Sequence, residues 1–143
     1  MKIRTDFVTN SSSSSYIVAY KKVPEVDAET AKRYPFLLKT YKNIIDGIIS
    51  CEGVDTSPAT VIKTKTEYDE YFVDRYGWSK TPTVKTILAD DKYLRETYHK
   101  VIEYLEKGYE IFCKDIGYHD ETLNELISNI ADGNEEFVIL ESE

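Results

Sequence analysis

The sequence predicts an α/β or α+β protein with a mixed central sheet of about four to five strands covered by amphipathic helices. Two observations lead to this prediction. Apolar side chains recur at three- and four-residue spacing, which is typical of amphipathic helices, over residues 36–49, 91–107 and 120–131. Short runs rich in β-branched and aromatic residues, which indicate strands, occupy residues 59–64, 109–116 and 136–141. Alternation of the two patterns favours a sheet with helices packed on it.

The length of the chain predicts one domain over residues 1–143, because 143 residues are enough for a single core and too few for two stable ones. A hydrophobic share of 41% and an aromatic share of 13% can build that core. Within the domain, residues 9–15 are expected to form a flexible serine-rich connection or N-terminal segment.

The N-terminal third contains two strand patterns and the first helices. Residues 3–8 fit a short extended segment, and residues 16–20 form a stronger strand pattern. Asp27 can cap a helical turn over residues 28–33. Pro35 suits the first turn of the helix at 36–49, because its missing N–H has no partner there.

The middle third predicts a strand followed by two helices. After the strand at 59–64, Thr66 begins a pattern that resembles a capping box, and Tyr68, Phe72 and Tyr76 share one face of the helix that follows. Gly77 ends that helix. A shorter helix is expected over residues 83–89.

The last third contains the clearest helix, which Asp90 or Asp91 caps and Gly108 ends. Pairs at i,i+4 spacing, Glu96 with Lys100 and Glu103 with Lys107, support it.

A strand at 109–116, a helix beginning at Asp120 and a strand at 137–140 follow. The continuous apolar run of the last strand indicates that both of its faces are covered. The unit 109–140 is long enough for a crossover connection, right-handed if its two strands are parallel.

The charge is distributed unevenly along the chain. The net charge is −8, and residues 109–143 carry ten acidic side chains against one lysine. Direct binding to nucleic acid is therefore not expected, because neutralisation of phosphates supplies most of that affinity. No apolar run approaches the roughly 20 residues of a membrane span, and no signal peptide is recognised, so a cytoplasmic protein without membrane contact is expected.

Neither cysteine is in a motif that indicates chemistry. Cys51 and Cys113 are far apart, with no CxxC pattern and no histidine at ligand spacing, so both are interpreted as small buried hydrophobic residues. No metal site and no cofactor are predicted, because P-loop, dinucleotide-binding and zinc-protease patterns are all missing.

The N-terminal stretch resembles the opening of other proteins. Residues 4–18, RTDFVTNSSSSSYIV, resemble the opening of a loose set of uncharacterised bacterial proteins that share a D-F-V-T-N-S-S-S-S-S-aromatic stretch, with Tyr16 at the aromatic position. The resemblance covers about a tenth of the chain and implies no catalytic residue. For the run from Asn10 to Ser15, a flexible surface connection is the preferred interpretation; a recognition tag or a modification site stays an alternative.

The tyrosines suggest an interaction surface. The chain has 12 tyrosines against 5 phenylalanines. Tyrosine and tryptophan suit surfaces that are wet in the unbound protein and buried in a complex. The candidate interface residues are Tyr68, Tyr71, Tyr76 and Trp78. The alternative is that these rings pack at the edge of the core.

A second candidate site lies where the strand at 109–116 ends. Ligands often bind beyond the carboxyl ends of parallel strands, where His119 could act as a base and Asp115 could orient it. The alternative is that a carboxylate is needed in this turn merely to cap the next helix.

Two functional hypotheses follow. The first, which is favoured, is a non-enzymatic protein-binding or adaptor protein, with a protein partner or a second copy of itself, that uses an acidic, tyrosine-rich surface; one variant is a mimic of nucleic acid. The second is a small hydrolase or transferase with its site near Asp115 and His119.

Overall fold

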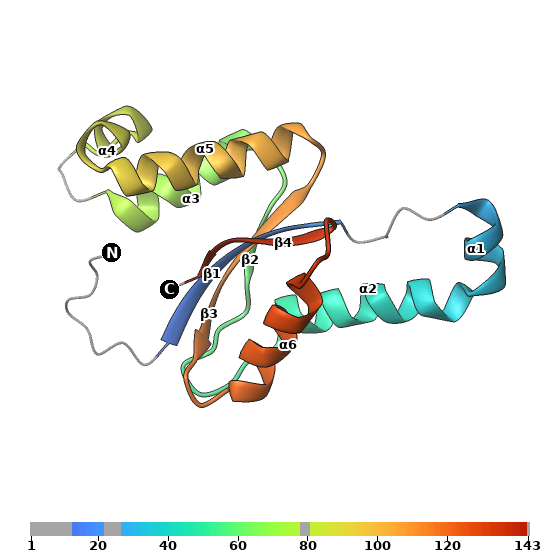
Figure 1. The fold of residues 1–143 in the computed structure, drawn as a ribbon. Helices are drawn as coiled ribbons and strands as arrows, with labels where there is room; N and C mark the ends of the chain where they lie inside the picture. Colours follow the sequence, from blue (N-terminus) through green and yellow to red (C-terminus); the bar gives the residue numbers. More distant parts are fainter. Residues whose placement is uncertain (1–12, 22–26, 78–80, 143) are drawn as a thin grey trace.

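The computed structural model describes residues 13–21, 27–77 and 81–142. Within them, two layers of helices enclose a four-stranded sheet of order β2-β3-β1-β4 (Figure 1). The predicted α/β class is confirmed, and all three pairs of neighbouring strands are antiparallel. The strand pattern at residues 3–8 lies outside the described residues.

The long central strands hold the sheet together. β1 (Ser13–Tyr20) pairs with β3 (Glu110–Gly117) along its whole length, and β4 (Phe137–Ser142) pairs with the other side of β1. β2 (Thr60–Ile62) adds a three-residue edge to β3 and is shorter than the predicted 59–64. Because β1 is antiparallel to both of its neighbours, β3 and β4 are parallel to each other, with β1 between them.

The serine run contributes to this sheet. The sequence predicts a flexible connection over residues 9–15, but Ser13, Ser14 and Ser15 form the start of β1. The reason is pairing: opposite them on β3 lie Gly117, Ile116 and Asp115. Tertiary pairing thus overrides the low strand preference of serine.

One face of the sheet is covered by α3 (Lys65–Tyr76), α4 (Val84–Asp90) and α5 (Lys92–Glu106), seen above the strands in Figure 1. Aromatic rings dominate this part of the core. Tyr68, Phe72 and Tyr98 pack with ring centroids 5.1–5.9 Å apart, against Ile111 and Cys113 of the sheet.

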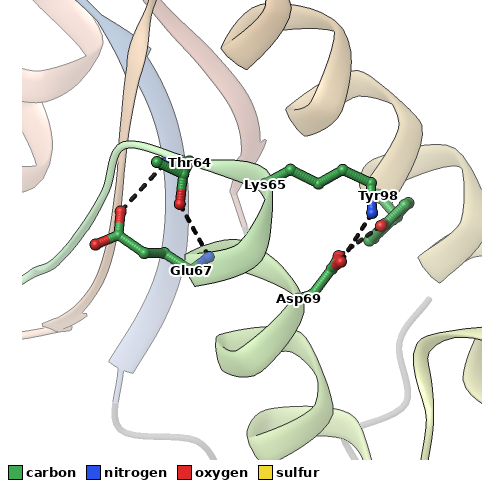
Figure 2. Close-up of polar contacts among 5 residues, drawn as sticks. All are labelled: Thr64, Lys65, Glu67, Asp69 and Tyr98. Atoms are coloured by element: carbon green, nitrogen blue, oxygen red, sulfur yellow. Dashed lines mark hydrogen bonds and ion pairs between the residues drawn. The ribbon is translucent and has the colours of Figure 1, made fainter.

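Polar contacts fix α3 at its first turn (Figure 2). The cap is Thr64 and not the predicted Thr66. Thr64 Oγ1 accepts from the Glu67 N–H at 3.1 Å, and the Glu67 carboxylate accepts from the Thr64 N–H. The sequence prediction chose the wrong threonine because Asp69, three residues after Thr66, is used elsewhere. Asp69 binds Lys65 at 2.8 Å and accepts from the Tyr98 hydroxyl at 2.5 Å, which ties α3 to α5.

α5 begins at the predicted cap, since the Asp91 carboxylate accepts from the N–H groups of Tyr93 and Leu94. Of the two predicted i,i+4 pairs on α5, Glu103 with Lys107 forms, at 2.9 Å.

The opposite face of the sheet is covered by α2 (Pro35–Ser50) and α6 (Glu121–Ala131), which lie below the strands in Figure 1. Ile45 and Ile48 of α2 and Ile127 of α6 pack on Phe112 and Phe137 of the sheet. No helix in the described parts of the chain is long and apolar enough to span a membrane.

The N-terminal part of this layer projects from the body (Figure 1). α1 (Ala28–Arg33) has no buried residue, and in α2 the buried residues are Ile45 and Ile48, near its C-terminal end. We refer to residues 28–44, which comprise α1 and the first part of α2, as the arm.

Candidate functional site

The two residues of the predicted catalytic pair do not meet. Asp115, on the α3 side of the sheet, accepts from Ser15 at 2.7 Å and pairs with Arg75 of α3 at 3.4 Å. His119 lies in the turn after β3, exposed to solvent. No hydrogen bond joins these two described residues. The capping alternative also fails, because α6 lacks a side-chain cap and the Asp120 carboxylate accepts from Thr56.

The contacts of Asp115 connect three elements of the fold. Arg75 donates to Ser15 at 3.0 Å as well as pairing with Asp115, so the three side chains tie β1, β3 and α3 together. Cys113, two residues earlier on the same face, is buried, and burial raises the pKa of its thiol to about 12. A thiol with that pKa stays protonated at neutral pH and is a poor nucleophile.

The predicted interface tyrosines belong to the core. Tyr68 has no exposed surface, and Tyr71 and Tyr76 are half-buried against the same aromatic cluster. Burial raises the pKa of all three hydroxyls, as expected for rings taken out of water. Packed in this way, they offer little surface to a partner. Trp78 lies outside the described residues.

A concave surface lies on the other side of the sheet, at the end where β1 begins and β3 finishes. We call it the α6 groove. It is a wide, open depression of about 620 Å³. The groove is formed by side chains from the start of β1, the β3–α6 turn and α6, namely Ser14, Tyr16, Tyr118, Glu121, Asn124, Glu125 and Ser128.

The floor of the groove is held by hydrogen bonds. The Tyr16 hydroxyl donates to Asn124 Oδ1 at 2.8 Å, and Asn124 Nδ2 donates to the carbonyls of Gly117 and Asp120 at 3.2 and 3.1 Å. Tyr16 is 8% exposed, and burial raises the pKa of its hydroxyl, so it stays a donor at neutral pH. The groove is therefore formed before any ligand binds, which lowers the entropic cost of binding.

The turn that carries Tyr118 is fixed as well. Thr56 Oγ1 accepts from the Gly117 N–H at 2.7 Å and donates to the Asp120 carboxylate, so the two residues that flank the turn share one partner. Glycine is required at 117 because a Cβ there would lie 2.1 Å from the Val54 carbonyl oxygen. The Tyr118 ring, 58% exposed, is thus presented to solvent from a fixed backbone.

The chemistry of the groove favours a cationic ligand with apolar parts. Glu121 and Glu125, one helical turn apart on α6, are both exposed, and none of the described lining residues is a lysine or arginine. The sole lysine of residues 109–143, Lys114, is buried and donates to the carbonyls of Cys51 and Ser57 at 2.8 and 2.7 Å. The Tyr118 ring can pack on apolar or cationic groups.

Metal binding has no support in the described ranges, where no group of three histidine, cysteine or carboxylate side chains is close enough to hold an ion.

Sequence reasoning missed this groove because its residues come from three separate segments. Two signals were available. Ser14 and Tyr16 alternate along one face of a strand, and Glu121 and Glu125 share one face of a helix. The register that brings Ser14 beside the β3–α6 turn could not be read from the sequence.

Comparisons of the chain with models of protein families, with curated proteins and with solved structures found no match.

Proposed function

We propose that this protein is a non-enzymatic protein-binding protein whose α6 groove takes a basic segment of a protein partner. The observation that carries the proposal is the preformed groove itself, where Tyr118 stands exposed beside Glu121 and Glu125. Exposed aromatic rings anchor protein interfaces, and complementary charge at the rim selects the partner and speeds association.

The shape and charge of the groove also separate this function from the alternatives. Its openness suits a chain that lies across it better than a small molecule that must be enclosed. Two glutamates repel phosphates, so nucleic acid is a poor ligand. The enzymatic alternative, with His119 and Asp115, is not favoured, because Asp115 faces the other side of the sheet in contact with Ser15 and Arg75.

We place this activity in the cytoplasm. Cys51 and Cys113 are both unpaired, in keeping with a reducing compartment.

Nuclear magnetic resonance with a model peptide tests the proposal. An amphipathic helical peptide of lysine and leucine is titrated into the ¹⁵N-labelled protein. The expected result is a set of shifts in the backbone amides around the groove, at Ser14, Tyr118, Glu121 and Asn124. A peptide of the same pattern with glutamate in place of lysine is expected to leave these amides unchanged.

A matched pair of variants completes the test. Glu121→Gln with Glu125→Gln removes the two charges at the groove and should weaken binding of the lysine peptide about tenfold. Glu96→Gln with Glu106→Gln removes two exposed charges from α5, on the other face of the sheet, and should change the affinity little. Equal weakening by both pairs, or shifts confined to other surfaces, would refute the proposal.

A further inference from the structure

We infer that the basic segment that fills the α6 groove is the arm of a second copy of this chain, so that the protein forms a two-fold dimer by reciprocal exchange of arms. This inference rests on the proposed function of the groove and names its partner.

The first support is an apolar stripe on α2 that continues beyond the core that covers it. Leu37, Tyr41, Ile44 and Ile48 follow one another at four- and three-residue spacing along one side of the helix. At the C-terminal end the stripe is covered, since Ile48 is 2% exposed; at the arm it is not, since Leu37 is 63% exposed. An apolar stripe that runs on into solvent indicates a surface that is covered by another molecule.

The apolar surface of the arm extends beyond this stripe. Phe36 is 80% exposed and Tyr34 is 46% exposed, although large aromatic side chains are usually buried. Both can serve as anchors in a groove, and aromatic anchors of this kind carry most of the binding energy of protein interfaces.

The second support is charge. The arm, residues 28–44, carries four lysines or arginines and one acidic residue, a net charge of +3 in a chain of net charge −8. Glu29 is paired with Arg33 at 3.0 Å, which leaves Lys39 and Lys42 exposed on α2 beside the aromatic residues. Two lysines one turn apart on α2 complement Glu121 and Glu125, one turn apart on α6.

The geometry excludes contact of the arm with the groove of its own chain. The α6 groove lies where β1 begins, whereas the arm projects past the end where β1 finishes (Figure 1). α2 is a continuous helix of 16 residues, about 24 Å long, and its C-terminal half is packed on the sheet. The arm therefore cannot bend back into the groove of its own chain without breaking α2.

Charge also selects arm-to-groove contact over other ways of covering the arm. Two arms packed against each other would bring together two surfaces of net charge +3. Arm-to-groove exchange pairs opposite charges twice and closes after two copies, as an isologous dimer does.

Sedimentation equilibrium of the full chain gives the first test, with a dimer as the expected result. Phe36→Ser with Leu37→Ser should weaken the dimer at least about tenfold, as anchor residues do. Reversal of charge in the arm, Lys39→Glu with Lys42→Glu, should have a similar effect. Reversal in the groove, Glu121→Lys with Glu125→Lys, should do the same.

Mixing the two charge-reversed variants is the sharpest test. Alone, the arm variant has an acidic arm and an acidic groove, so its own copies repel each other. The groove variant has a basic arm and a basic groove, with the same consequence. Mixed in equal amounts, each arm meets a groove of opposite charge, so a heterodimer about as stable as the native dimer should form. Reversal of two exposed lysines on α5, Lys92→Glu with Lys100→Glu, is the control and should leave the native dimer intact.

The outcomes separate this inference from the proposed function. A chain that stays monomeric at its highest soluble concentration would overturn the inference, as would a dimer unaffected by these variants, an open polymer or a failure of the mixed variants to associate. Titration of Phe36→Ser with Leu37→Ser by the lysine–leucine peptide then tests the groove alone. Shifts at the groove would leave the proposed function standing, and their absence would refute both.

Discussion

Ser15 of β1 and Asp115 of β3 are directly opposite in the sheet, and Ser15 Oγ donates to Asp115 Oδ1 at 2.7 Å. Arg75 of α3 reaches both residues, so a serine of the polar run connects three elements. Two residues earlier, Ser13 lies opposite Gly117 at the same end of the sheet. The contact thus helps to hold the start of β1 where its other face forms the floor of the α6 groove.

Replacement of this serine should lower stability by a modest amount. Ser15→Ala removes the hydroxyl that donates to Asp115 and accepts from Arg75, and because the site is half-exposed we expect a loss of about 1 kcal/mol in the free energy of unfolding. Ser14→Ala, on the opposite face of β1, is the control and should change stability by less than about 0.5 kcal/mol. Urea denaturation measures both, and equal losses would contradict a specific role for Ser15.

Replacement of the buried Lys114 should lower the free energy of unfolding by more than replacement of Ser15. Its ammonium group donates to the carbonyls of Cys51 and Ser57 and so fastens the segment after α2 to the sheet. Lys114→Met keeps the length of the side chain but leaves two carbonyls without their donor, and we expect a loss of about 2 kcal/mol. Hydrogen exchange should accelerate at Gly53 and Thr56, whose amides bond within this segment. Unchanged exchange at these two amides would contradict the role of Lys114 in holding this segment on the sheet.

Two core tyrosines should respond in opposite ways to loss of the hydroxyl. The Tyr68 hydroxyl is buried and has no hydrogen-bond partner among the residues that the structure describes, whereas the Tyr98 hydroxyl donates to Asp69. Tyr68→Phe removes an unsatisfied polar group and should leave stability unchanged or raise it by up to about 1 kcal/mol, while Tyr98→Phe should lower it by about 1 kcal/mol. Thermal denaturation of the pair tests this, and the opposite order would show that Tyr68 has a partner in solution.

Stability should fall at alkaline pH, in part through Cys113. Burial raises the pKa of this thiol from 9.0 to about 12, so above pH 9 the unfolded chain loses a proton that the folded chain keeps. The folded state then binds more protons, and its stability falls as the pH rises from 9 to 12, by at most about 1.4 kcal/mol per pH unit from this group. The contribution of the thiol is fully present below pH 9.

Cys113→Ala tests the assignment, because alanine has no proton to lose. Buried tyrosines, whose pKa values are also raised, will still lower stability above pH 10 in both proteins. Between pH 9 and 10 the variant should therefore show a flatter dependence of the free energy of unfolding on pH. Identical slopes for the two proteins would mean that the thiol is ionised or exposed in the folded state.

The sequence predicts the helices well because each carries its own signal. The stripe of α5 and its cap at Asp91 are local features, and the structure has both. The stripe of α2 is equally clear, but local periodicity does not indicate how far along the helix the core extends, so the sequence does not predict the exposure of Phe36 and Leu37.

The features that sequence reasoning missed depend on contacts between distant segments. The sequence predicts that Asp115 orients His119, four residues away, whereas Asp115 contacts Ser15, 100 residues away. The amphipathic character of tyrosine favours a surface position for Tyr68, yet the faces of α3 and α5 close over it. Strand order brings Ser15 beside Asp115, and the packing of α5 against α3 buries Tyr68; nothing local in the chain encodes either.

Isothermal titration of the lysine–leucine peptide into the full chain, at low and at high salt, tests the central claim about the α6 groove most directly. We expect saturable binding at one site per chain that weakens with salt, and at least about tenfold weaker binding to the Glu121→Gln, Glu125→Gln variant at low salt. An affinity that is the same for both proteins would contradict a protein-binding role for the groove.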